Sequence, residues 1–362
     1  MKIKIEKRLD APRILVILMP LVAVIIAFVI SGILIATTGA NPFAAFDTMW
    51  KGAFGTTYSL SETIVSSIPL MLAGLGVGIA SHAKLWNIGG DGQIIMGAFA
   101  ASGLALFYPD LPRPILIGGM MILGFLAGGL WAVIAALPRI YLGINEIITT
   151  MMFNFIAGFW VSYIVQGPWR DPILVGFPFT AKFTKEAWLP RFFGTRIHLG
   201  LVIALIAAVI IAILLYRSKW GYELRVIGGS LDSANYAGIN VKRSLLLAML
   251  LSGGLAGLAG MAEVSGILHR LQEGIAAGAG FSAFILVALA NGNPFGIIVS
   301  GFLLGALLTG GTSAQTMGVP PQIADIMQGL ILFFVLASTF FTRYRVKFDR
   351  PELKSANVES GD

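Results

Sequence analysis

Long apolar segments recur along the whole chain, and they constrain its fold more than any other feature. The first, Ile14–Ala36, has 23 residues and no charged side chain, and about 20 such residues cross a bilayer as a helix. Only 12% of the residues are charged, whereas a soluble domain carries about 25%. We therefore expect an all-α, polytopic membrane protein with about ten transmembrane helices. The predicted spans are Ile14–Ala36, Ile64–Ala80, Ile88–Phe107, Ile115–Leu137, Ile144–Val165, Ile197–Tyr216, Leu245–Ala262, Gly278–Ala290, Phe295–Thr309 and Ile323–Phe341.

The basic residues are unevenly distributed between the loops. With the N-terminus inside, 17 of the 25 Lys and Arg residues lie in inside loops and tails. Because basic loops stay on the cytoplasmic side, both termini are expected there. The predicted organisation is a cytoplasmic segment 1–13, a transmembrane domain 14–341 with a cytoplasmic loop 217–243, and a cytoplasmic tail 342–362. The net charge of +7 is explained by these loops, so no nucleic-acid partner is predicted.

Three of the predicted spans are irregular. Ile88–Phe107 opens with a polar, Gly-rich stretch, and the short pair Gly278–Ala290 and Phe295–Thr309 is joined by a polar turn. Interrupted segments at matching places in two halves indicate a transport site, with backbone that leaves the helix only beside protein or a water-filled cavity. Leu70–Leu106 and Leu247–Leu289 share one order of apolar and polar segments. Five spans separate corresponding elements, so the two copies form a possible inverted repeat.

Two clusters of polar residues, one around Asp91 and one around Glu146, fall at membrane depth. One interpretation is that they line a pathway, since acids inside a membrane are costly and mark functional sites. The other is that they cap broken helices, Asn145 capping the helix that Glu146 begins. Glu263, His269, Glu273 and Asp325 are interpreted as gating or capping residues. The candidate substrate-pathway residues are Asn87, Asp91, Gln93, Asn145, Glu146 and Asn154.

No catalytic, metal or cofactor site is predicted. The chain lacks cysteine, its three histidines are far apart, and no nucleotide-binding or hydrolase motif occurs. No Lys or Arg falls within a predicted span, which favours a neutral or zwitterionic solute. Glycine pairs four residues apart, at Gly74/Gly78, Gly253/Gly257 and Gly301/Gly305, predict close helix packing.

The loop Arg217–Arg243 is the longest polar run with a basic bias, with five basic and two acidic residues. A short helix is predicted from Asp232 to Tyr236, because Gly228-Gly229-Ser230 precedes it and Gly238 follows it. A polar helix between two spans on the basic side suits the docking of a soluble partner.

Four stretches resemble the permease subunits of bacterial ABC importers for simple sugars and purine nucleosides. They are LWNIGGDGQIIMGA (Leu85–Ala98), GINEIITTMMFNFIA (Gly143–Ala157), the loop GYELRVIGGSLDSANYAGINVKR and ALANGNPFGIIVSGFLLGAL (Ala288–Leu307). The resemblance extends from about Ser59 to Thr339. Two departures are Asp91, where the family usually has Glu, and Ser230-Leu231, where Asn-Pro is common.

The resemblance implies about ten helices per subunit, similar to the vitamin B12 importer class, in the bacterial cytoplasmic (inner) membrane. It implies two permease subunits, two cytoplasmic ATP-binding subunits and an extracytoplasmic substrate-binding protein. This chain would then be a transport subunit and not an enzyme, because ATP is hydrolysed in a separate subunit. The residues assigned to coupling with that subunit are Arg225, Gly228, Asp232, Ala234, Tyr236, Ala237 and Gly238.

The outer loop with GPWRDP (Gly167–Pro172) and the GINEIITTMMFNF variant are most similar to nucleoside-type permeases, which commonly pair with a non-identical permease. The expected function is import of a neutral solute, most specifically a purine nucleoside. Two alternatives stay open. The same importer type could carry a simple sugar or riboflavin, or the chain could be an ion-coupled secondary transporter with ion sites at Asp91, Glu146 and Glu263.

Overall fold

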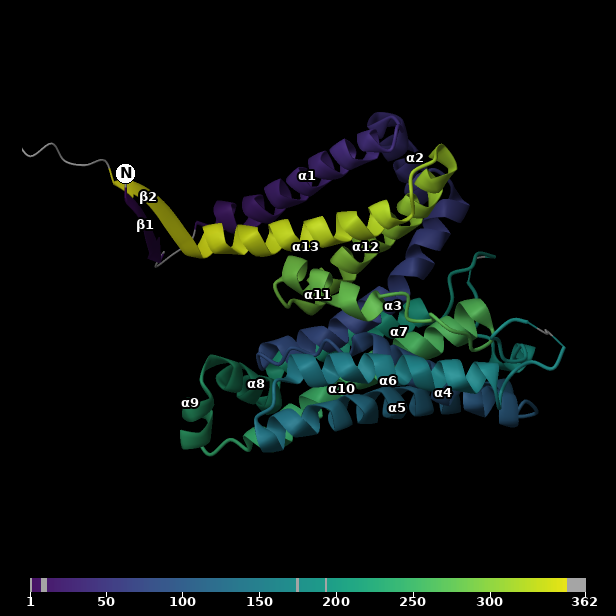
Figure 1. Cartoon of the computed structure of the whole chain (residues 1–362). Helices are drawn as coiled ribbons and strands as arrows, with labels where there is room; N and C mark the ends of the chain where they lie inside the picture. Colours follow the sequence, from purple (N-terminus) through teal and green to yellow (C-terminus); the bar gives the residue numbers. More distant parts are fainter. Residues whose placement is uncertain (1, 8–11, 174–175, 193, 350–362) are drawn as a thin grey trace, which may run out of the picture.

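Apolar helices make up most of the structure, a computed structural model that describes residues 2–7, 12–173, 176–192 and 194–349 (Figure 1). The long helices are α1 (Arg13–Thr37), α2 (Pro42–Phe54), α3 (Thr57–His82), α4 (Gly90–Phe107), α5 (Arg113–Leu142), α6 (Glu146–Gln166), α7 (Gly200–Arg217), α8 (Lys219–Gly229), α10 (Val241–Glu263), α11 (Ala279–Ala290), α12 (Pro294–Ala314) and α13 (Gln322–Arg343). Shorter elements are β1 (Lys2–Lys7), η1 (Lys185–Ala187), α9 (Leu231–Tyr236), the π-helical η2 (Val264–Leu268), η3 (Gln315–Met317) and β2 (Tyr344–Asp349).

Each of the ten predicted spans coincides with a helix. Eight helices in the described part of the chain are long and apolar enough to cross a membrane, and Ala279–Ala290 and Gln322–Ser338 are shorter apolar helices. The chain is a multi-pass membrane protein. The predicted span Phe295–Thr309 was too short, because α12 continues through Gly310 and Gly311 to Ala314. These glycines let α12 approach Met49 of α2 and Ala324 of α13 closely.

Two helices were not predicted. Asn41 begins α2 by accepting from the backbone N–H groups of Phe43 and Ala44, and Ser218 begins α8 by accepting from Gly221. Both helices are shorter than a span, with 13 and 11 residues. Neither helix is an apolar run of span length, so the hydropathy pattern did not predict them.

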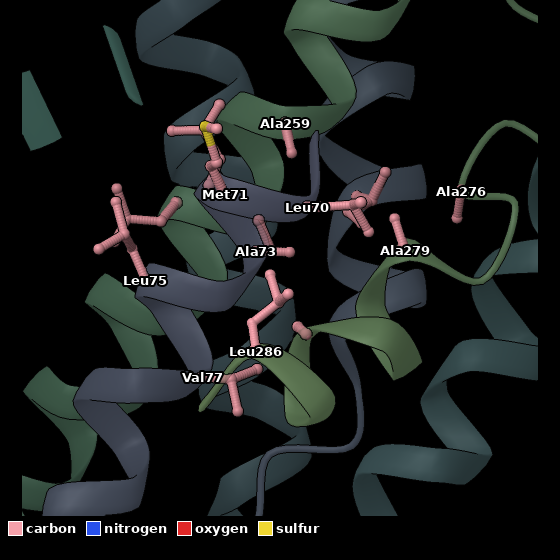
Figure 2. Close-up of a cluster of buried hydrophobic side chains, with 14 of the residues drawn as sticks. Leu70, Met71, Ala73, Leu75, Val77, Ala259, Ala276, Ala279 and Leu286 are labelled. Atoms are coloured by element: carbon pink, nitrogen blue, oxygen red, sulfur yellow. The ribbon is translucent and has the colours of Figure 1, made fainter. Parts of the chain in front are cut away.

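The core is built around α3. This helix is buried along most of its length and packs against α10, α11 and α12. Figure 2 shows Leu70, Ala73 and Val77 of α3 beside α11, with Leu286 lying next to Ala73 and Val77. Glycine lets the backbones of α3 and α10 approach closely, because a Cβ on Gly76 would collide with the carbonyl oxygen of Ser252 in α10. This packing agrees with the role predicted for the Gly-rich spans.

Helices of each half of the chain pack against helices of the other half, as expected for an inverted repeat. In the first half α3 is followed by α4 and α5, and in the second half α10 is followed by α11 and α12. α3 packs on α11 and α12, whereas α10 packs on α4 and α5, and α3 and α10 contact each other. The first turns of α4 and α11 meet at Gly90 and Gly280, where an added Cβ on either residue would collide with the other backbone. This reciprocal packing supports the predicted inverted repeat.

The bundle has two distinct ends. Gly228 of α8 packs against the carbonyl oxygen of His82, the last residue of α3, so α3 ends beside α8 and α9. The described residues of the segment 167–199, which are 167–173, 176–192 and 194–199, lie at the opposite end (Figure 1). We call these the α9 end and the loop end. β1 pairs antiparallel with β2, from Lys2 opposite Asp349 to Lys7 opposite Tyr344, and this ribbon lies towards the α9 end (Figure 1). Residues 350–362 of the predicted tail, and residues 1 and 8–11 of the N-terminal segment, lie outside the described residues.

Gly128→Val should destabilise the bundle by roughly 1–3 kcal/mol, because the new side chain would collide with Gly253 and Gly257 of α10. Gly118→Val is the matched control, since Gly118 lies in the same helix and a Cβ there meets no atom within 4 Å. The unfolding temperature in detergent measures both. Equal unfolding temperatures for the two variants would contradict the close α5–α10 packing.

Candidate functional site

A cavity of about 630 Å³ opens at the loop end between α3, α12, α13 and the segment that links α10 to α11. It extends inward to Leu70 of α3, Ile94 of α4 and Ala279, the first residue of α11. The cavity therefore ends where α4 and α11 begin. Its polar lining residues are Tyr58, Ser59, Glu62, Ser66, Arg196, Glu263, Ser282, Thr309, Thr312, Ser313, Asp325 and Gln328.

Negative charge predominates in this lining. Glu62, Glu263 and Asp325 face the cavity together with one basic residue, Arg196. Arg196 Nη1 lies 2.8 Å from Glu62 Oε2. Glu263 and Asp325 were noted in the sequence as gating or capping residues, and the cavity brings both together. Glu62 and Arg196 were missed, because 134 residues separate them and neither lies in a recognisable motif.

The start of α11 forms the inner wall of the cavity. Ile275 to Ala279 line it, and Ala277 and Gly278 have positive φ angles of 45° and 76°. The αL conformation is unfavourable for alanine, and backbone hydrogen bonds from Ala277 to Gly274 and from Ala279 to Ala276 close this turn. Asp91 Oδ1 accepts the backbone N–H of Gly280 at 2.7 Å. A carboxylate of α4 thereby satisfies a free N–H donor of the first turn of α11 and neutralises its positive dipole end.

The other residues of the first polar cluster hold the segment that precedes α4. Asn87 Nδ2 donates to Gln93 Oε1 at 3.0 Å, and Gln93 Nε2 donates back to Asn87 Oδ1 at 2.8 Å. Asn87 Nδ2 also donates to Ser252 Oγ of α10 at 2.9 Å. Asn87 and Gln93 are buried, and these reciprocal bonds satisfy their amides inside the bundle.

The second cluster supports the same segment from α6. Asn145 accepts from the N–H of Ile147, which confirms it as the N-cap of α6. Glu146 lies 3.3 Å from Arg139 Nε. Asn154 accepts the N–H of Gly92 at 2.8 Å and donates to the carbonyl of Ile88 at 2.9 Å. Asn154 thus bridges the break between α3 and α4.

None of the six predicted pathway residues belongs to the lining of the cavity among the described residues. The hydrogen bonds of Asn87, Asp91, Gln93 and Asn154 instead fix the breaks at which α4 and α11 begin, and Asn145 caps α6. The capping interpretation accounts for these bonds. Contact between these side chains and a substrate stays a prediction.

The segment 167–199 is fastened to the chain between α10 and α11. Phe183 N–H donates to the carbonyl of His269, and Leu189 N–H donates to that of Ser265. Trp188 stacks on the His269 ring with centroids 3.9 Å apart, and Arg191 Nη2 lies 3.0 Å from His269 Nε2. Burial, followed by the nearby Arg191 charge, lowers the pKa of His269 to about 4. Neutral His269 therefore anchors the loop to the segment that leads into the cavity wall.

The predicted short helix is present as α9, which projects from the bundle with α8 (Figure 1). Ser230 caps it by accepting from the N–H of Ser233. Ala234 is fully buried, whereas Tyr236 is 97% exposed. Gly238 has φ of +72° and turns the chain towards α10. Among the residues assigned to coupling, Asp232, Tyr236, Ala237 and Gly238 are exposed, Arg225 is exposed and donates to the carbonyl of Leu215, and Gly228 and Ala234 are buried.

The chain matches known proteins over most of its length. A family model described as the permease component of branched-chain amino acid transport systems matches residues 59–336. A glucose ABC transporter permease protein of Haloferax volcanii is 31% identical, over 96% of this chain and 95% of the relative. A guanosine ABC transporter permease protein of Bacillus subtilis is 31% identical, over 93% and 96%. A nucleoside ABC transporter permease protein of Lactococcus lactis is 30% identical, over 88% and 90%.

Asn154→Leu should destabilise the protein, because it leaves the N–H of Gly92 and the carbonyl of Ile88 without their partner. Each buried unsatisfied group costs roughly 1–3 kcal/mol. Asn145→Ala is the control: it removes an exposed cap worth about 1 kcal/mol. Unfolding temperatures in detergent compare the two. An Asn154→Leu variant as stable as wild type would contradict the bridging role.

Proposed function

We propose that this chain, which belongs to the family of permease components of branched-chain amino acid transport systems, forms the membrane-spanning subunit of an ATP-driven importer for purine nucleosides. The observation that carries the proposal is the near full-length similarity to permeases named for guanosine and for nucleosides. Nucleosides carry no charge, and the cavity disfavours an anionic cargo, because its charged lining residues are three acids and one base.

We infer that the α9 end faces the cytoplasm and that the protein lies in the bacterial inner membrane. The basic bias of the tails and of the loop Arg217–Arg243 supports this orientation. The loop end and its cavity then face outward, towards an extracytoplasmic substrate-binding protein. A second permease subunit, non-identical in nucleoside-type systems, completes the membrane part.

Separate ATP-binding subunits that dock on α9 supply the energy for transport. The exposed face with Asp232 and Tyr236 offers the contact, and the buried Ala234 fixes the helix to its neighbours. Gly228 packs on the end of α3, and the chain after Gly238 enters α10 within three residues. A displacement of α9 is therefore transmitted to α3 and α10, which supply Glu62 and Glu263 to the cavity.

A simple sugar is the second candidate cargo. One specific observation favours it, the 31% identity to a glucose permease over nearly the whole chain. Riboflavin import by the same kind of assembly and ion-coupled transport without partners are the remaining outcomes that the uptake experiment separates.

Cells that carry this gene with its genomic neighbours should take up labelled guanosine and adenosine in an ATP-dependent manner. Unlabelled nucleosides should compete, whereas ribose, glucose and riboflavin should not. Competition by a sugar or by riboflavin would keep the importer and change its cargo. Uptake that survives ATP depletion and is abolished by an ionophore would refute the hypothesis that ATP drives transport.

Tyr236→Asp should abolish ATP-dependent uptake while the protein still inserts into the membrane, because it replaces the exposed aromatic ring of α9 by a charge. Gly238→Trp should act in the same way, by opposing a positive φ angle. Tyr108→Asp is the control, since Tyr108 is also exposed but ends α4 at the loop end. Normal uptake by Tyr236→Asp would remove α9 from the coupling path.

A further inference from the structure

The cavity holds a carboxylate that the protein itself leaves without a partner. Glu263 ends α10 and lines the cavity. Within the part of the chain that the structure describes, its carboxylate has no hydrogen-bond or ion-pair partner. Unpaired acids within a membrane span are costly and mark functional positions. A solute that donates hydrogen bonds would satisfy this carboxylate.

Among the three cavity acids, Glu263 is the one whose two carboxylate oxygens are both without a partner and which is not fully exposed, within the described residues. Glu62 is engaged through Oε2 by Arg196, although its Oε1 is buried without a partner among the described residues. Asp325 is exposed at the start of α13. Glu263 differs from both, because it is only partly exposed and unpaired.

A buried amide adds a second recognition group. Gln328 is 8% exposed and lines the cavity one turn after Asp325. Its Oε1 accepts from Ser282 Oγ at 2.8 Å, which leaves its Nε2 to donate. The cavity therefore presents carboxylate acceptors together with one oriented amide donor.

This arrangement restricts the class of solute. A carboxylate accepts two parallel hydrogen bonds when a ligand offers two adjacent donors. An anionic solute is disfavoured, because acidic residues outnumber basic ones in the lining, three to the single Arg196. We propose that Glu263 is a specificity-determining residue that binds an uncharged solute through a pair of adjacent O–H or N–H donors. In a nucleoside such a pair is either the vicinal diol of ribose or the N1–H and N2–H edge of guanine. This assignment rests on the proposed function.

The test measures binding of labelled guanosine and adenosine to the complete transporter, purified in detergent without its substrate-binding protein. Glu263→Gln keeps the shape of the side chain but replaces one acceptor by a donor, and it should raise Kd for guanosine roughly tenfold or more. Glu263→Asp keeps the charge and should lose less. Glu273→Gln is the matched control, because Glu273 lies at the same end, outside the cavity lining, and accepts from Ser162 and Gln166.

The ligand panel identifies which donor pair is bound. If Glu263 binds guanine, Glu263→Gln weakens guanosine far more than adenosine. If it binds ribose, both nucleosides weaken equally and 2′,3′-dideoxyguanosine binds wild type and Glu263→Gln with the same low affinity. Either pattern supports the assignment, and a change in selectivity is a readout that a merely structural residue would not produce.

Two results would overturn it in distinguishable ways. Wild-type cells that import no nucleoside or sugar would refute the proposed function, and this inference with it. Wild-type import combined with unchanged affinities in Glu263→Gln would refute the role of Glu263 and leave the proposed function intact. Unfolding temperatures of all variants confirm that each binding measurement is made on folded transporter.

Discussion

Two helix N-termini meet inside the bundle, and the polar groups, the short helix α11 and the cavity all follow from this contact. α4 and α11 begin next to each other at Gly90 and Gly280, each after a non-helical break. Free N–H groups of a first turn cannot find water in hydrocarbon, so the protein must supply acceptors. Asp91 supplies one through its bond to the N–H of Gly280. Without this carboxylate, two positive dipole ends would face each other at this point.

The breaks need a scaffold of their own, and the polar residues around them provide it. Asn87, Gln93 and Asn154 bind one another or the nearby backbone and leave none of the bridged groups unsatisfied. Because α11 has only 12 residues, about 18 Å of helix, it fills only part of the membrane thickness. The cavity occupies space at the loop end next to its N-terminus. The shortness of α11 therefore leaves room for the cavity.

The sequence predicted the features that local physics controls. Long apolar runs predicted the spans, the Gly and Ser caps predicted α9, and the shortness of Gly278–Ala290 predicted an incomplete helix, each confirmed. The predicted end of α12 at Thr309 was wrong, because the helix continues through Gly310 and Gly311, where close packing against α2 and α13 favours glycine. The cavity could not be predicted, since Glu62, Arg196, Glu263 and Asp325 come from four distant parts of the chain. Only the packing of the repeats brings them together.

The same packing relates the two ends of the molecule. α3 carries Glu62 near its start and meets α8 at its end, while α10 begins just after α9 and finishes at Glu263. Both helices are in contact with each other through Gly76 and Ser252. Densely packed interiors transmit displacements as rigid shifts and not as gradual deformations. In the proposed importer, a shift of α9 would therefore move α3 and α10 together relative to α12 and α13, and with them Glu62 and Glu263 on one wall of the cavity.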